Sequence, residues 1–272
     1  MKPIVLWRPH DPLDPTEENA IKGHFDLVRQ RTEVGPGRLV IGRYSVLPFY
    51  KELEQDILNQ GSKLINTYSE HLYVADLQNW YYDLQNETPV TMFTPEDTFL
   101  FGRPPFVVKG ETNSRKFQWN THMFALNKID AVDIANELLQ DSLLSTQNIY
   151  VRQYVPLVKL AEGLNGMPIT EEYRFFILDG YILSGAFYWS SHVADVEKVP
   201  DPWSVPGFFD WFDEVLNRTC TKIRFYVVDV ARTAEGKWIV IEMNDGQMSG
   251  LSENDPTILY GAMKEVLRYE RT

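Results

Sequence analysis

Acidic and amide side chains follow directly on an apolar run near the end of the sequence. Residues 238–241 are Trp, Ile, Val and Ile, which is typical of a buried β-strand, and Glu242, Asn244 and Asp245 come soon after. Burying carboxylates without compensation costs several kcal/mol each, so a core strand would end this way only beside a cation or bound donors. Carboxylate and amide oxygens suit Mg²⁺, which proteins often hold together with substrate phosphates.

A preceding strand, centred on Asp229, supplies a further carboxylate. If residues 234–235 form a two-residue hairpin loop, Asp229 faces Val240. Because side chains alternate between the two faces of a strand, Val240, Glu242 and Asn244 then lie on one side of the sheet, and the facing carboxylate points to that side too. We predict that Asp229, Glu242 and Asn244 bind metal. A solvated strand end without a metal is the alternative that the hairpin alone leaves open.

A polar loop follows the apolar strand that ends at Lys109. Its sequence, "GETNSRK", offers hydroxyl and cationic groups. A lysine at a strand end beside such a loop can hold the phosphates of a nucleotide. We predict phosphate contacts from Lys109, Ser114, Arg115 and Lys116. The loop carries no Walker motif, and a solvated surface loop is the alternative.

The segment "EEYRFFILDG" places Glu172 and Arg174 on one face of a strand. Asp179 and Gly180 are typical of a type I′ hairpin turn, and we expect Arg174 to fall opposite Gly185. The small residue would leave room for the guanidinium to reach over the sheet towards a phosphate. A cross-strand salt bridge is the alternative.

The strand "IYVRQYVPL" is interrupted at Pro156, which has no N–H to donate to a neighbouring strand. The backbone beside the proline is therefore expected to be free to pair with the edge of a nucleotide base. We predict nucleotide contacts from Gln153, Tyr154, Val155 and Leu157.

The elements that must position these residues follow two patterns. Over roughly the first 95 residues, apolar strands alternate with amphipathic helices, which favours a small α/β unit. Beyond it the pattern is α+β and is dominated by antiparallel hairpins. We predict a mixed α/β and α+β fold in three parts: an N-terminal α/β domain at 1–95, a subdomain with the phosphate loop at 96–148, and a subdomain with the metal-binding strands at 149–272.

Composition excludes several classes of protein. The formal net charge of −12 and the absence of a long basic run disfavour nucleic acid as a partner. The five histidines are scattered without zinc-type spacing, and a single cysteine favours a reducing, cytoplasmic location. No apolar run reaches the length of about 20 residues that a membrane-spanning helix needs.

In this order the motifs resemble those of the ATP-grasp superfamily: a lysine-ended strand, a phosphate loop, a hinge strand, a Glu-x-Arg hairpin, and an Asp followed by Glu-x-Asn. The resemblance is carried by "EYR" at 172–174, "VVDV" around Asp229, "IEMN" at 241–244 and "GRYSVLPFYKELE" from Gly42. It covers essentially the whole chain and is strongest with small ATP-grasp proteins of phages and bacteria whose substrates are uncharacterised. That group is related to the eukaryotic ATP-grasp chaperone that assembles a translation initiation factor.

The resemblance implies an ATP-grasp fold, in which two α+β subdomains sandwich the nucleotide and a small α/β domain precedes them. It also implies ATP and two Mg²⁺ ions as cofactors. The roles that it implies are phosphate binding by Lys109, adenine binding by residues 153–157, contact of Arg174 with the γ-phosphate or a reacting intermediate, and metal binding by Asp229, Glu242 and Asn244.

The sequence departs from the superfamily in two respects. Its phosphate loop lacks the usual glycines. Many members also use a further upstream basic residue, for which Lys63 and Arg103 are the candidates in this chain.

In the ATP-grasp pattern, a substrate carboxylate attacks the γ-phosphate and an amine then takes the acyl group. The resemblance therefore implies a carboxylate–amine ligase, with an unidentified acid and amine drawn from amino acids, peptides or proteins. Lys109 and Arg174 would be catalytic, and Ser249 or Ser252 could orient the acyl phosphate. The chaperone-like relatives leave open an ATP-binding assembly chaperone that does not ligate, and a small-molecule kinase is a third alternative.

Overall fold

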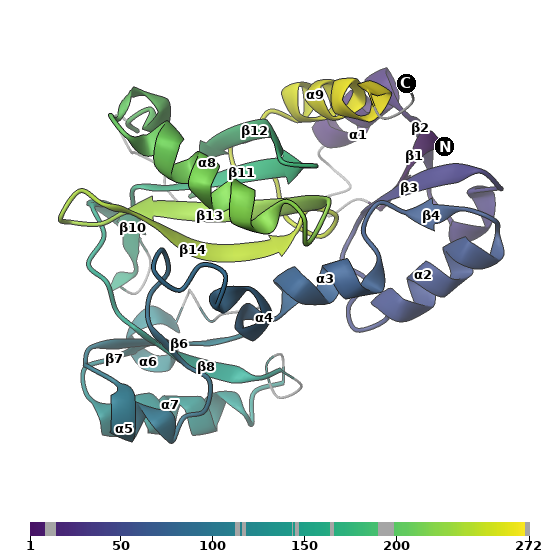
Figure 1. The fold of residues 1–272 in the computed structure, drawn as a ribbon. Helices are drawn as coiled ribbons and strands as arrows, with labels where there is room; N and C mark the ends of the chain where they lie inside the picture. The colour runs from purple at the N-terminus through teal and green to yellow at the C-terminus, as the bar shows by residue number, and fades with distance from the viewer. Residues whose placement is uncertain are drawn as a thin grey trace.

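The computed structural model describes residues 1–8, 15–111, 115, 118–142, 144, 147–163, 166–189 and 199–269. In this part of the chain, three four-stranded sheets and one two-stranded sheet are arranged as Figure 1 shows. The described helices include none that is long and apolar enough to cross a membrane.

The N-terminal sheet is parallel, with the strand order β2-β1-β3-β4. Its two central strands are buried along almost their whole length, as expected when a parallel sheet is covered on both faces. This is the α/β unit that the alternating pattern predicts. Its elements are β1 (Lys2–Trp7), α1 (Thr16–His24), β2 (Asp26–Val28), the 3₁₀ helix η1 (Arg31–Glu33), β3 (Arg38–Arg43), α2 (Tyr50–Asn59) and β4 (Lys63–Leu64).

A second sheet is antiparallel, with the order β5-β8-β6-β7. The pairing of Thr91 with Arg152 places β5 in this sheet, although the sequence pattern groups β5 with the first 95 residues. The elements that lead to it and build it are α3 (Tyr68–Ala75), α4 (Leu77–Tyr81), β5 (Thr91–Met92), α5 (Asp97–Phe101), β6 (Phe106–Gly110), α6 (Trp119–His122), β7 (Phe124–Ala125), α7 (Lys128–Leu138) and β8 (Ile149–Gln153).

The third sheet is also antiparallel and has the order β12-β11-β13-β14. One of its faces packs on α8 and α4, and the other packs on α1 and α9 (Figure 1). A two-stranded sheet precedes it. The elements are β9 (Lys159–Glu162), β10 (Pro168–Thr170), β11 (Glu172–Leu178), β12 (Tyr181–Phe187), the 3₁₀ helix η5 (Pro202–Ser204), α8 (Phe208–Thr219), β13 (Phe225–Arg232), β14 (Trp238–Asp245) and α9 (Pro256–Tyr269).

The β11–β12 hairpin has the predicted turn but not the predicted register. Asp179 and Gly180 both have positive φ, 50° and 81°, as a type I′ turn requires. A bulge further along the hairpin then shifts the pairing by one, so Arg174 lies opposite Ala186 and the expected pairing with Gly185 is wrong. Gly185 instead faces Phe175, whose ring atoms lie 2.2 Å from where a Cβ on the glycine would stand.

The β13–β14 hairpin departs from prediction twice. Its loop has three residues, 234–236. The Thr233 amide donates to the Lys237 carbonyl, the Lys237 amide donates to the Thr233 hydroxyl, and Gly236 has a φ of +86°. A bulge between Asp229 and Val230 shifts the register again. Asp229 therefore lies opposite Glu242, and the predicted pairing of Asp229 with Val240 is wrong.

The two departures preserve the predicted convergence of Asp229, Glu242 and Asn244 but overturn the predicted face of Val240. Together they move the register by two residues, so Asp229 and Glu242 still share a face. Val240 does not share it, because Ile241 is the extra residue and the alternation breaks there. Val240 packs in the core with Met243, on the opposite side of the sheet, and Asn244 follows on the side of Glu242.

Candidate active site

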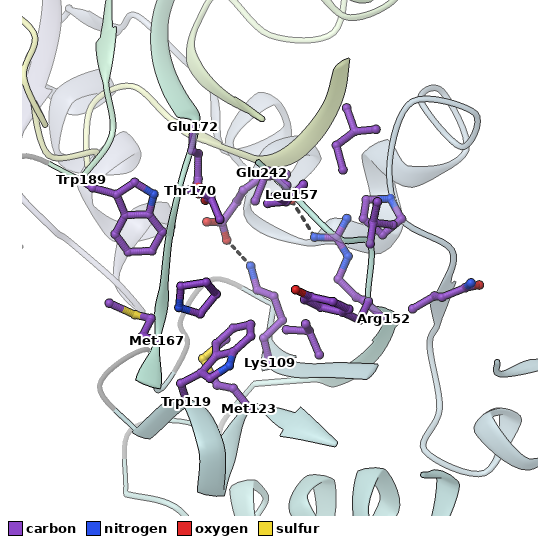
Figure 2. A pocket seen from close by; sticks show the side chains of 18 residues that line it. Lys109, Trp119, Met123, Arg152, Leu157, Met167, Thr170, Glu172, Trp189 and Glu242 are labelled. Carbon is purple, nitrogen blue, oxygen red and sulfur yellow. Dashed lines mark hydrogen bonds and ion pairs between the residues drawn. The ribbon is translucent and has the colours of Figure 1, made fainter. Parts of the chain in front are cut away.

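A pocket with about 860 Å³ of space, part of it open to solvent, lies between the second and third sheets (Figure 2). Strands β6 and β8 form one wall, and β10, the start of β11 and β14 form the other. The apolar lining of the pocket includes Val107, Trp119, Met123, Leu157, Met167, Trp189, Ile239 and Ile241.

Lys109 and Glu242 form an ion pair across the pocket (Figure 2). Lys109 is the buried penultimate residue of β6, and Glu242 belongs to β14 in the other sheet. Glu172 lines the same wall and accepts a hydrogen bond from Thr170 Oγ1 at 3.3 Å. A hydrogen-bonded ion pair therefore links the two sheets at Glu242, one of the predicted metal ligands.

Asp229 and Arg174 form a second ion pair deeper in the third sheet. The guanidinium donates through Nε and Nη2 to the two carboxylate oxygens at 2.8 and 2.7 Å, and Asp229 is fully buried. Arg174 also donates through Nη1 to the carbonyl of Gly250 at 2.9 Å and stacks on the ring of Tyr188. Burial alone would lower the pKa of Arg174, but the Asp229 carboxylate outweighs it and raises that pKa above its ordinary value. Of the two arrangements that the sequence left open for Arg174, the cross-strand ion pair is present.

Arg152 is a third buried cation, and the sequence analysis did not select it. It lines the pocket from β8 and donates to the Thr88 hydroxyl and the Ile241 carbonyl, each at 2.6 Å, and to the Thr91 hydroxyl at 3.3 Å. Burial lowers its pKa to about 10, and the nearby Glu242 carboxylate partly offsets this. An arginine inside the apolar run "IYVRQYV" is the signal that could have identified it.

The charges described at the site balance. Neutrality is the arrangement that a partly dry pocket tolerates best, since each uncompensated buried ion costs several kcal/mol. A polyanion that enters must therefore bring cations with it or displace the carboxylates. Lys109, Arg152, Glu172 and Glu242 line the pocket, and Arg174 and Asp229 form the ion pair deeper in the third sheet.

The segment predicted to bind a base lies along the pocket. Gln153, Tyr154, Val155 and Leu157 all line it. The main-chain amides of Gln153 and Tyr154 donate hydrogen bonds to the carbonyls of Val90 and Pro105, at 2.8 and 2.9 Å. Within the described residues, no main-chain hydrogen bond involves the N–H or C=O of Val155. The same holds for Leu157, but Leu157 forms a β-bridge with Thr233, which leaves Val155 as the residue of this segment best placed to pair with a base edge.

The predicted phosphate loop is described only in part. Ser114 and Lys116 lie outside the described residues. Arg115 is half-buried and makes a bidentate ion pair with Asp141, just beyond α7. The two upstream candidates, Lys63 on β4 and Arg103 before β6, are exposed and are absent from the described lining of the pocket.

The loop after β14 is anchored by a buried polar network. Asp245 accepts from Asn66 Nδ2 at 3.0 Å and from the Gln247 amide at 2.8 Å, and it contacts His71 Nδ1 at 3.1 Å. Ser249 donates to the Asp245 carbonyl at 2.8 Å. This bond holds the Ser249 hydroxyl against the loop. Ser252 stands at a positive φ of 55° and is half-buried.

The donor set fits Mg²⁺ in its chemistry. Asp229 and Glu242 lie opposite each other in register, and Asn244 follows on the same face, which gathers two carboxylates and one amide. The described residues contain no group of three or more His, Cys, Asp or Glu side chains that could hold a metal. A cation here would thus depend on ligands from a bound phosphate as well as from the protein, as is usual for Mg²⁺.

Comparison with known proteins gives both a family and a fold. The family model for the ATP-grasp domain, R2K clade family 3, matches residues 100–263. No curated protein shows significant sequence similarity to the chain.

Several solved structures share the fold of the whole chain. D-cycloserine synthetase DcsG superposes with a TM-score of 0.62 at 15% identity, covering 97% of this chain and 99% of its own. A RimK domain ATP-grasp protein from Sphaerobacter thermophilus gives 0.58 at 14%, covering 97% and 98%. A D-alanine–D-alanine ligase from Bacillus anthracis, solved with ATP, gives 0.57 at 13%, covering 100% of both chains. The predicted ATP-grasp fold is thereby confirmed.

Proposed function

Because the chain belongs to the R2K clade of the ATP-grasp domain family, we propose that it binds ATP with Mg²⁺ in this pocket and acts as a carboxylate–amine ligase. The observation that carries the proposal is the facing pair Asp229 and Glu242, each matched by a cation, beside the pocket between the two sheets.

The adenine would lie between the apolar walls of the pocket. Trp119, Met123 and Met167 offer flat or adaptable surfaces for a base, and Val155 offers its main chain to the base edge. The triphosphate would then extend towards Lys109 and Glu242, where the two sheets approach each other (Figure 2). Lys109 would exchange Glu242 for phosphate oxygens, since both are anionic partners within its reach.

Asp229, Glu242 and Asn244 would hold Mg²⁺, two ions by the family pattern. When bound, Mg²⁺ neutralises the charge that develops on the phosphates during transfer. The balanced charges of the site support this assignment. ATP brings several negative charges, which the described cations cannot offset while they are paired with carboxylates.

The reaction would begin when an oxygen of the substrate carboxylate attacks the γ-phosphorus and ADP leaves. An amine then attacks the acyl carbon, phosphate leaves, and the amide forms with loss of a proton from the amine. Phosphoryl transfer of this kind needs positioning and charge neutralisation more than a protein nucleophile. The described lining contains neither Cys nor His, which is consistent with that route. Lys109 and Arg174 would supply the positive charge.

Solved relatives support ligase chemistry without naming the substrates. Three of them are a D-alanine–D-alanine ligase, a D-cycloserine synthetase and the ligase PsnB with a precursor peptide. At 10–15% identity they guide only the choice of reaction class. An amino acid or a peptide is the natural first choice for the acid and the amine.

The test is ADP release from ATP and Mg²⁺ in the presence of pools of amino acids and peptides. Release that depends on one acid and one amine, with an amide product in the mass spectrum, supports the ligase. Tight ATP binding without dependent turnover points instead to a nucleotide-using chaperone, and a stable phosphorylated product points to a kinase. Glu242→Gln and Asp229→Asn should each abolish Mg²⁺-dependent binding. If both variants bind ATP and Mg²⁺ as the wild type does, the site assignment is wrong.

A further inference from the structure

Strand β14 is an edge strand whose bulge faces the pocket. It pairs with β13 on one side only, and the register shift makes Ile241 the extra residue. A bulge of this kind leaves main-chain groups outside the ladder and turns the next side chain in a new direction. Here the turned side chain is Glu242, and both Ile241 and Glu242 line the pocket.

Groups from outside the third sheet form hydrogen bonds with the main-chain N–H and C=O groups on the outer edge of the bulge. The Val240 amide donates to the Glu87 carbonyl at 2.6 Å, and the Thr88 hydroxyl donates to the Val240 carbonyl at 2.9 Å. The Ile241 carbonyl accepts from Arg152 Nη1 at 2.6 Å. The chain segment before β5 and the arginine on β8 therefore hold the bulge from the second sheet.

Burying the guanidinium of Arg152 at this position costs free energy. It is buried, and the three hydrogen-bond acceptors recorded for it are two hydroxyls and one carbonyl, all neutral. Burying a cation is costly even with the Glu242 carboxylate nearby, and an apolar side chain could fill the same space at lower cost, although without these hydrogen bonds. The rigid fork of a guanidinium can, however, reach the Thr88 hydroxyl and the Ile241 carbonyl at once.

We propose that Arg152 is a positioning residue, which fixes the β14 bulge through the Ile241 carbonyl and the Thr88 hydroxyl and thereby aims the Glu242 carboxylate at the metal that accompanies ATP. The proposal rests on the proposed function, because it takes Glu242 as a metal ligand. Arg152 reaches the Ile241 carbonyl of β14 from a different sheet, so it also makes the orientation of Glu242 dependent on how β8 packs against β14.

The alternative is that Arg152 binds a phosphate directly. The two roles differ in how they depend on the metal. A residue that aims Glu242 affects only the Mg²⁺-dependent part of nucleotide affinity, whereas a phosphate contact contributes with or without Mg²⁺.

The experiment measures binding of a non-hydrolysable ATP analogue by calorimetry, first in EDTA and then across a Mg²⁺ titration. The variants are Arg152→Met, Arg152→Lys and Thr88→Val, the last of which removes only the hydroxyl between Arg152 and Val240. Arg224→Met is the matched control, since it removes a guanidinium from a bidentate pair with Asp179 at the far end of the third sheet. The melting temperature of each variant reports on folding.

Arg152→Met and Arg152→Lys are expected to raise the Mg²⁺ concentration for half-maximal binding by about 10- to 100-fold, as for other residues that orient a metal ligand. Thr88→Val should shift it in the same direction by less, and affinity in EDTA should stay unchanged in all of them. Equal losses in EDTA and in Mg²⁺ would overturn the proposal in favour of a phosphate contact. Wild-type Mg²⁺ dependence in folded Arg152 variants would overturn it outright. If the wild type itself binds no analogue with Mg²⁺, the proposed function fails, and the inference fails with it.

Discussion

The ion pair between Asp229 and Arg174 should behave as a buried unit in the nucleotide-free protein. Asp229→Asn leaves a buried guanidinium without its carboxylate, and Arg174→Met leaves a fully buried carboxylate without its cation. Removing one member of such a pair costs about 3–5 kcal/mol in free energy of unfolding. Removing both leaves no orphaned charge. The double variant loses mainly the bond from Arg174 to the Gly250 carbonyl, about 1.5–3 kcal/mol for a charged donor.

The four proteins form a double-mutant cycle, measured by urea denaturation without nucleotide or Mg²⁺. The free energy lost in the double variant should be several kcal/mol smaller than the sum of the two single losses. Arg224→Met, Asp179→Asn and their double variant provide the control. That pair has the same bidentate distances, 2.8 and 2.7 Å, but it is partly exposed, so we expect about 1 kcal/mol or less. Additive losses at Asp229 and Arg174, or single losses no larger than those of the control pair, would refute the reasoning.

Three further predictions concern single residues. Gly185→Ala should destabilise the protein by about 1–3 kcal/mol in urea denaturation, because its Cβ would stand 2.2 Å from ring atoms of Phe175; an unchanged midpoint would contradict the packing described. Burial raises the pKa of Glu171 above 4.5, so the stability gained from its protonated form is complete below pH 4.5 and is lost as the pH rises through the raised value. Glu171→Gln should therefore flatten this decline in urea denaturation at a series of pH values, and a parallel decline in the variant would argue against it. Lys109→Met should lower the melting temperature of the nucleotide-free protein by leaving Glu242 without its paired cation, and Lys109→Met combined with Glu242→Gln should recover part of the loss; no recovery would show that the pair is not coupled.

The sequence predicts the architecture well because its signals are local and repeated. Alternating strands and helices identify the N-terminal α/β unit, and Asp179-Gly180 specifies the turn of the β11–β12 hairpin because both residues tolerate positive φ. The bulges were not predictable in this way. An extra residue in a strand has no characteristic composition, and Ile241 looks like any other apolar residue in "WIVIEM".

The site was predicted with a similar mixture of success and failure. Asp229 and Glu242 do lie together, because a loop one residue longer than expected and a bulge together shift the register by two residues, which keeps them on one face. Arg152 was missed because local patterns show that an arginine is buried but not what it contacts. Its partners, Thr88 and Ile241, lie 64 and 89 residues away in the sequence. Such contacts follow from tertiary packing, which short motifs do not encode.

The ion pair between Lys109 and Glu242 also has a consequence for how the proposed ligands would bind. In the nucleotide-free protein, the Lys109 ammonium group is paired with the Glu242 carboxylate, which is the group proposed to coordinate Mg²⁺. Free Mg²⁺ must therefore compete with Lys109 for Glu242. When phosphates draw Lys109 away, that competition ends, and each ligand strengthens the binding of the other by the same factor. The protein would then respond to the complex of nucleotide and metal and would discriminate against either component alone. Heterotropic cooperativity of this kind needs no second site and no change of fold, only one lysine with two alternative partners.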